Sequence, residues 1–231
     1  MNRYRRAFVD VLHTLDNATR AAARPDAPRL LAVSKTRTAD EIAALAGLGQ
    51  KSFGENYVQE AAGKIAALAG LGLEWHLIGH LQSNKARDAA RDFDWVQTVD
   101  RAKLATALAR HRPDALPPLN VLLQVNIDDE ASKHGCRPDD IPALAAAAAA
   151  EPRLALRGLM AIPAPHADPE RRRPAFRRMR ELFDRLREVH PQADTLSMGM
   201  SDDFAIAIAE GATMVRIGSA LFGPRTAKET A

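Results

Sequence analysis

Lys35 is the first residue of this chain whose type and position suggest chemistry. It directly follows RLLAVS (29–34), an apolar run with the length of a buried strand. The ordinary interpretation is a surface lysine whose stem packs on the strand end. However, the chain has only 7 lysines beside 25 arginines, so an ammonium group at this place is a selective choice. Apolar walls and neighbouring cations favour the uncharged amine, which is the nucleophile that a Schiff base requires.

A second candidate site lies near the end of the chain, in ATMVRIGSALFG (212–223). Gly218 allows close backbone approach, Ser219 supplies a hydroxyl group, and the amides of the following turn point outward. This combination suits a phosphate group. The preceding turn, LSMGMSDDF (196–204), adds the hydroxyl of Ser201. Since glycine and serine are also the default residues of turns, ordinary turn chemistry is the alternative interpretation.

Arg216 lies in a strand-like run between Val215 and Ile217, so its side chain must face away from theirs. A buried arginine needs an acceptor, and a structural salt bridge is one interpretation. The functional interpretation is a hydrogen bond to a ring nitrogen. A nucleophilic amine, a phosphate cradle and an arginine for a pyridine nitrogen together describe a site for pyridoxal 5'-phosphate (PLP).

These residues need a scaffold that brings distant strand ends together. After an opening helix at about residues 3–22, strand-like runs alternate with amphipathic helical segments. The expected strands are residues 29–34, 51–55, 74–79, 94–99, 120–126, 154–161, 194–199 and 213–218. Eight such units predict an α/β fold, a single (β/α)8 TIM-type barrel with an extra N-terminal helix, as one domain over residues 1–231. An open doubly wound sheet is the alternative, but the first turn, SKTRTAD, lacks its glycine-rich phosphate motif.

The carboxyl ends of the strands in such a barrel converge on one mouth, where active sites lie. The residues expected there are Lys35, Glu55, Asn56, His80, Asp100, Asn126, Met160, Ala161, residues 197–201, Arg216, Gly218 and Ser219. His76, inside the third strand, is expected to be a hydrogen-bonded core residue.

Composition excludes several other classes of protein. A net charge of +3 is too small an excess of base to predict nucleic-acid binding, and apolar residues at helical spacing make the arginine-rich segment 171–180 a solvated helix face. The single cysteine, Cys136, excludes an internal disulfide and favours a reducing compartment. No run of 18 apolar residues and no signal-like N-terminus is present. We therefore expect a cytoplasmic protein with no membrane partner and, because a closed barrel has no sheet edge, a monomer.

Seven ordered motifs extend this interpretation over about residues 30–223. They are LAVSKT, FGENYVQE, WHLIGHLQSNK, VNIDDEASKHG, GLMAI, LSMGMSDDF and VRIGSALFG. Together they resemble the pyridoxal phosphate homeostasis protein family, also called PLP-binding proteins. The resemblance implies a single barrel similar to the barrel domain of alanine racemase, which holds PLP, has no established catalytic turnover and supplies PLP to apoenzymes.

The resemblance also implies roles for individual residues. Lys35 would form the Schiff base, Arg216 would contact the pyridine nitrogen, and serines with Gly218 would bind the phosphate. The full set expected to bind the cofactor is Lys35, Asn56, His80, Met160, Ser197, Ser201, Arg216, Gly218 and Ser219. No catalytic residue and no metal ligand is expected. Lys133 matches a family lysine that would be a secondary PLP site or a loop partner, but His134 and Gly135 follow it where the family often has Ser-Gly.

The choice between enzyme and carrier follows from two features. An arginine at the ring nitrogen cannot give up a proton to it, so the ring is a weak electron sink. Neither tyrosine, Tyr4 or Tyr57, is expected opposite Lys35 as the second base that racemisation needs. A PLP carrier is therefore the leading prediction. The alternatives are a weak amino-acid racemase, a Schiff-base aldolase that uses Lys35 without PLP, and an interaction module.

Overall fold

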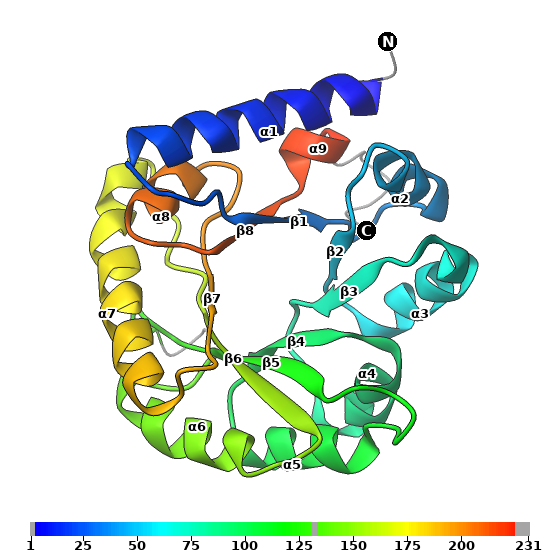
Figure 1. The fold of residues 1–231 in the computed structure, drawn as a ribbon, viewed down its shortest axis with the longest axis vertical. Helices are drawn as coiled ribbons and strands as arrows, with labels where there is room; N and C mark the ends of the chain where they lie inside the picture. Colours follow the sequence, from blue (N-terminus) through cyan, green and yellow to red (C-terminus); the bar gives the residue numbers. More distant parts are fainter. Residues whose placement is uncertain (1–2, 131–133, 225–231) are drawn as a thin grey trace.

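The predicted (β/α)8 barrel is confirmed. The computed structural model describes residues 3–130 and 134–224, and its eight parallel strands pair in sequence order until β8 closes on β1 (Figure 1). The strands are β1 (Arg29–Val33), β2 (Ser52–Glu55), β3 (Glu74–Leu77), β4 (Trp95–Val99), β5 (Leu119–Gln124), β6 (Leu154–Met160), β7 (Thr195–Ser197) and β8 (Met214–Ile217). Each lies within its predicted range, except that β5 begins one residue earlier.

Helices surround the barrel, and α1 is the predicted extra N-terminal helix (Figure 1). The α-helices are α1 (Arg3–Ala21), α2 (Ala39–Ala46), α3 (Val58–Ala67), α4 (Ala86–Asp92), α5 (Ala102–His111), α6 (Ile141–Ala149), α7 (Arg173–Val189), α8 (Phe204–Ala209) and α9 (Ser219–Phe222). Short 3-10 turns are η1 (Ala69–Leu71), η2 (Ser83–Lys85), η3 (Pro138–Asp140) and η4 (Pro169–Arg172). In the part of the chain that the structure describes, no helix is both long and apolar enough to cross a membrane.

The helix α7 illustrates how the sequence builds the outer layer. Phe176, Met179, Phe183 and Leu186 recur every three or four residues, and all four are buried against the barrel. Arginines occupy the outer face of α7 between these residues and form ion pairs with carboxylates. Arg177, for example, pairs with Glu210, the C-cap residue of α8. The arginine-rich segment is therefore a helix face, as predicted.

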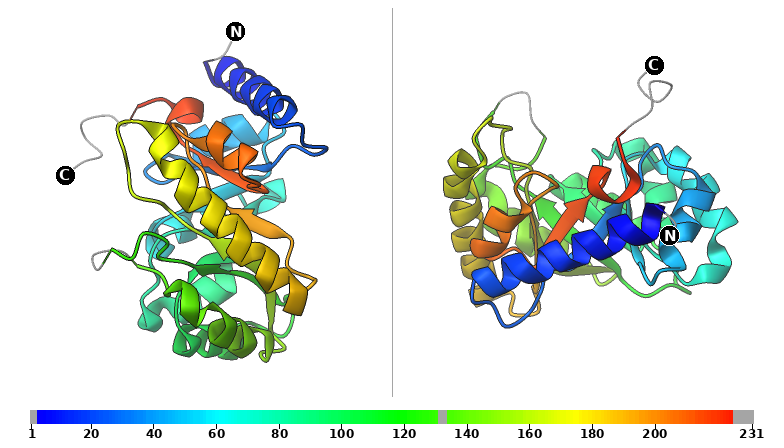
Figure 2. Two further views of the ribbon diagram at one scale, coloured as in Figure 1. Left: turned by 90° about the vertical axis from the view of Figure 1, so that its left-hand side faces the viewer. Right: turned by 90° about the horizontal axis from the view of Figure 1, so that it is seen from above.

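The helix α1 lies across α8 and α9, on the side of the barrel where β8 meets β1 (Figure 2). Phe8, Val11 and Leu15 face inward and are buried. Inside the barrel, Trp95, Leu122 and Met160 form a small apolar cluster of their own, separate from the larger core between strands and helices. The interior also contains the buried polar residues His76, Gln97, Ser197 and Arg216, and they lead to the site.

Candidate functional site

A cavity of about 190 Å³ lies at the carboxyl ends of β1, β7 and β8. Its lining residues are Val33, Lys35, Arg37, Met200, Ser201, Arg216, Gly218, Ser219 and Gly223. Five residues predicted from the sequence, Lys35, Ser201, Arg216, Gly218 and Ser219, therefore meet in one cavity. They bring together an amine, a buried guanidinium and two hydroxyl groups whose oxygens lie 3.3 Å apart.

The turn that carries Lys35 has an unusual backbone. Thr36 adopts a φ of 66°, in the left-handed region that a β-branched residue rarely occupies. Its amide donates a hydrogen bond of 2.6 Å to the carboxylate of Glu60 on α3. A strained conformation persists only where the surroundings hold it, and such positions concentrate at functional sites. The strain here directs the chain just after Lys35.

A buried ion pair supports the same turn from below. The ammonium of Lys64 on α3 donates to both carboxylate oxygens of Glu55 at 2.9 and 3.0 Å, to Glu60 at 2.5 Å, and to the carbonyl of Ser34 at 2.9 Å. The hydroxyl of Ser34 also donates to Glu55 at 2.6 Å. Burial raises the pKa of Glu55 above its usual range, although the hydrogen bonds from Ser34 and Lys64 lower it. This cluster, which we call the Lys64 clamp, ties β1, β2 and α3 together directly under Lys35.

Arg216 is held by neutral acceptors. Its guanidinium donates to the hydroxyl of Ser197 and to the carbonyl of Ala161, both at 2.8 Å, and its side chain is almost fully buried. Burial lowers the pKa of Arg216 to about 10, so the group still carries its charge at neutral pH. Neither of these two acceptors is a carboxylate, so neither contact is the structural salt bridge considered from the sequence. The carboxylate of Asp203 acts against burial and raises the pKa of Arg216.

A chain of hydrogen bonds continues from Arg216 through the barrel. The hydroxyl of Ser197 donates to Gln97 at 2.7 Å, and the amide of Gln97 lies 2.9 Å from Nδ1 of His76. With Nδ1 as acceptor, Nε2 of His76 donates to Glu74 at 2.6 Å. Burial lowers the pKa of His76, which keeps this imidazole neutral. His76 is thus a hydrogen-bonded core residue, as predicted, and the chain fixes the orientation of Ser197 beneath Arg216.

The turn after β7 depends on Gly199. Its φ is 92°, and a Cβ atom there would lie 2.6 Å from Cβ of Ala207. Its carbonyl accepts the amide of Arg216 at 3.0 Å, so this turn joins β8 at the level of the cavity. Asp203 stands at the N-cap of α8, but its carboxylate makes no cap bond and instead accepts from the Met200 amide and from Arg172.

Asn56 and His80 line a different hollow, together with residues of α3 and of the turn before α4. The two loops meet where Gly79 lies against Asn56, because a Cβ atom on Gly79 would be only 2.1 Å from the Asn56 carbonyl oxygen. Two further predicted residues, Met160 and Ser197, are fully buried in the interior beneath the mouth. Lys133 lies outside the described residues.

The sequence did not point to the Lys64 clamp or to Gln97. Lys64 follows Glu60 by one helical turn, which by itself indicates a surface ion pair. The scarcity of lysine in the chain distinguishes Lys64 as much as it distinguishes Lys35. For Gln97, alternation along β4 placed its side chain in the barrel interior, yet nothing in the sequence paired it with Ser197 or His76.

The fold and the site define a single (β/α)8 barrel with a cavity at the carboxyl ends of its strands. Comparison with known proteins identifies the family. The chain matches the family model of the alanine racemase N-terminal domain over residues 10–226. It is 56% identical to the pyridoxal phosphate homeostasis protein of Pseudomonas aeruginosa, over 90% of each chain, and 54% identical to that of Escherichia coli K12, again over 90% of each. The chain therefore belongs to the pyridoxal phosphate homeostasis protein family, as the motifs predicted.

A solved structure supports the same assignment. PipY of Synechococcus elongatus PCC7942, whose structure contains bound PLP, is 34% identical and superposes with a TM-score of 0.82. The superposition covers 95% of this chain and 100% of PipY. The barrel is thus shared along its full length with a relative that binds PLP.

Proposed function

We propose that this protein binds PLP in the cavity at the ends of β1, β7 and β8 and holds it through a Schiff base on Lys35. The observation that supports this most directly is the convergence of Lys35, Arg216 and Ser219 on one cavity. The donor set fits the three functional parts of PLP: the amine suits its aldehyde, the hydroxyl groups suit its phosphate, and the guanidinium suits its pyridine nitrogen. When bound, PLP supplies an electrophilic aldehyde and an electron-accepting ring.

We further propose that the protein is a carrier, without catalytic turnover, that maintains the PLP pool and supplies apoenzymes in the cytoplasm. Arg216 keeps its proton at neutral pH and can only donate a hydrogen bond, so it leaves the ring a weak electron sink. The tyrosines give little support to racemase chemistry. The hydroxyl of Tyr4 donates to Glu41 on α2, and Tyr57 is 64% exposed beside the other hollow. A monomer suits this role because the barrel sheet is closed.

The decisive experiment traps the covalent link. Purified protein loaded with PLP should show a visible absorbance band that borohydride bleaches, and intact-mass analysis should then show a single phosphopyridoxyl group on Lys35. Lys35→Ala should lose both signals. Lys103→Ala, which removes an exposed lysine of α5, is the matched control and should keep them. A band that persists unchanged in Lys35→Ala would refute the assignment.

The carrier role is tested separately. Holoprotein mixed with a PLP-dependent apoenzyme should restore that enzyme's activity, and chiral assays with excess amino acids should detect no sustained racemisation. Sustained turnover would establish an enzyme instead. A carbonyl substrate trapped on Lys35 by borohydride, without any PLP band, would establish a Schiff-base aldolase.

A further inference from the structure

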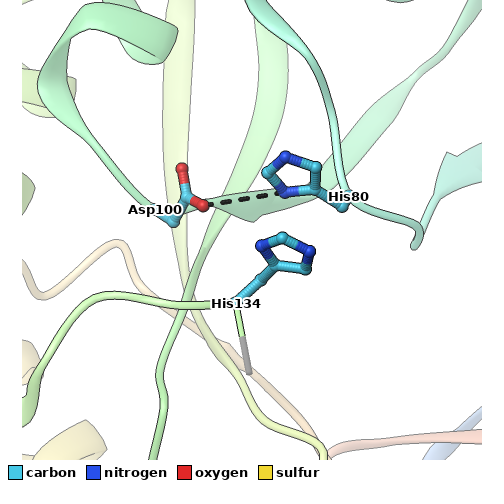
Figure 3. A group of neighbouring side chains, drawn as sticks. All are labelled: His80, Asp100 and His134. Carbon is cyan, nitrogen blue, oxygen red and sulfur yellow. Dashed lines mark ion pairs between the residues drawn. The ribbon is translucent and has the colours of Figure 1, made fainter. Parts of the chain in front are cut away.

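Three potential metal ligands, His80, Asp100 and His134, lie together at the mouth of the barrel (Figure 3). They come from the loops that follow β3, β4 and β5, so they are far apart in the sequence. Their ligand atoms all lie within 4.8 Å of one another. The two imidazole rings stack with centroids 3.7 Å apart and an interplanar angle of 12°, and Nδ1 of His80 lies 3.9 Å from Oδ2 of Asp100. We call these three residues the His-Asp-His cluster.

The backbone holds His134 in this position. Its carbonyl accepts the side-chain amide of Gln124 at 3.2 Å. Gly135 has a φ of 124°, and a Cβ atom there would lie 2.6 Å from the Asn126 nitrogen. The next residue, Cys136, bonds through its amide to the carbonyl of Gln124 at 2.9 Å. His134 is therefore part of a segment fastened to the end of β5, and its ring stays beside His80.

The carboxylate of Asp100 is oriented in the same way. Its Oδ1 accepts from Arg101 at 2.5 Å, and Arg101 is itself fixed by the carbonyl of Leu81 and the hydroxyl of Ser83. These contacts turn Oδ2 toward His80. The side chain of His80 is 33% exposed, so an ion from solvent can reach the cluster.

We propose that the His-Asp-His cluster binds one divalent transition-metal ion of the Zn²⁺ class through two imidazole nitrogens and one carboxylate oxygen. The ligands of a tetrahedral zinc ion stand about 3.3 Å apart, given bond lengths of about 2.0–2.2 Å. The ligand atoms lie within 4.8 Å of one another, so the gaps must close by about 1.5 Å. The two stacked rings must also turn out of their parallel arrangement, so that the lone pairs of both nitrogens point at one ion. Water occupies the fourth position, as in zinc sites with three protein ligands.

The ligand chemistry selects the class of ion. Mg²⁺ and Ca²⁺ prefer oxygen ligands, whereas imidazole suits zinc, copper and nickel. This site could not be predicted from the sequence, because His80, Asp100 and His134 match no ligand spacing pattern, and no metal ligand was expected. The cavity that contains Lys35 is lined by none of the three residues. The cluster shares only His80 with the residues that the sequence predicted to bind PLP, and it does not include Lys35.

The test measures Zn²⁺ binding to the full chain by calorimetry, with a competing chelator to define the affinity. Wild type should bind one Zn²⁺ per chain. His134→Ala should raise the dissociation constant for Zn²⁺ by roughly 100-fold or more. Loss of a direct ligand should cost more affinity than loss of an outer-sphere partner, which costs about 10- to 100-fold. His13→Ala, which removes an exposed histidine of α1, is the matched control and should bind as wild type does.

Two further measurements separate the possible outcomes. Asp100→Asn keeps the side-chain volume and should also weaken binding, while circular dichroism confirms that each variant is folded. Lys35→Ala should retain Zn²⁺ binding, whether or not the PLP proposal holds. Loss of binding in Lys35→Ala would assign the ion to bound PLP, and equal affinity in wild type and His134→Ala would indicate an adventitious ion only. Either result would overturn the proposal.

Discussion

Lys64→Met should strongly destabilise the protein. The Lys64 side chain is 9% exposed, and its ammonium bonds both oxygens of Glu55, whose side chain is fully buried. Methionine preserves much of the apolar stem but leaves a buried carboxylate without its cation. Removing one partner of a buried ion pair costs about 3–5 kcal/mol, and we expect the free energy of unfolding to fall by that amount near neutral pH.

The loss should also depend on pH. Burial raises the pKa of Glu55 in the folded protein, and removal of Lys64 raises it further. The folded variant then binds this proton more tightly than the unfolded chain, so its stability falls as the pH rises through the folded pKa. The difference between Lys64→Met and wild type should therefore be larger at alkaline pH than near the ordinary carboxyl pKa of about 4.3.

Urea unfolding followed by circular dichroism measures these free energies, and borohydride trapping measures PLP retention. The double variant Glu55→Gln with Lys64→Met should recover most of the stability, because no fully buried charge is left unpaired and the Glu60 carboxylate, 30% exposed, can be hydrated. PLP retention should fall in Lys64→Met, since the clamp supports the turn of Lys35 through Ser34 and Glu60. Lys103→Met, at an exposed position of α5, is the control. A loss below about 1 kcal/mol, the range of surface ion pairs, would refute the reasoning.

Three other predictions concern different parts of the molecule. Because burial lowers the pKa of His76, the neutral imidazole stabilises the fold above the unfolded pKa of about 6.5, and this stabilisation is lost as the pH falls through the folded pKa. His76→Gln should reduce this dependence of the free energy of unfolding on pH, measured by urea unfolding at several pH values. Gly79→Ala should lower the melting temperature because its Cβ would meet the carbonyl of Asn56, whereas Gly63→Ala, in open space on α3, should raise stability by about 0.5–1 kcal/mol. Ser219→Ala should weaken PLP binding about tenfold or more in a spectroscopic titration, since a hydrogen bond to a charged group contributes about 1.5–3 kcal/mol, and unchanged affinity would exclude a phosphate contact.

Much of the architecture was predictable from local patterns. Strand-like runs that alternate with amphipathic helices specify parallel strands with crossover helices, and eight of them close a barrel. The run RLLAVS ends at Ser34, one residue after β1 ends, so Lys35 had to lie at the mouth. Arg216 alternates with two apolar neighbours, so its side chain had to lie on the face opposite theirs, and in the structure that face is the interior of the barrel. These conclusions depend only on periodicity and on the common direction of the strands.

The partners of those residues were decided by the tertiary structure. Lys64 could equally have remained on the surface with Glu60, and only the packing of α3 against β1 and β2 brings it to Glu55. The His-Asp-His cluster depends in the same way on how three loops fold over the mouth. Sequence alone determined most of the chemical groups that reach the mouth, because these follow the strand ends, but it did not predict Arg37 or His134 there. Which groups touch there was decided by packing, because side-chain contacts between distant segments depend on register, loop conformation and burial.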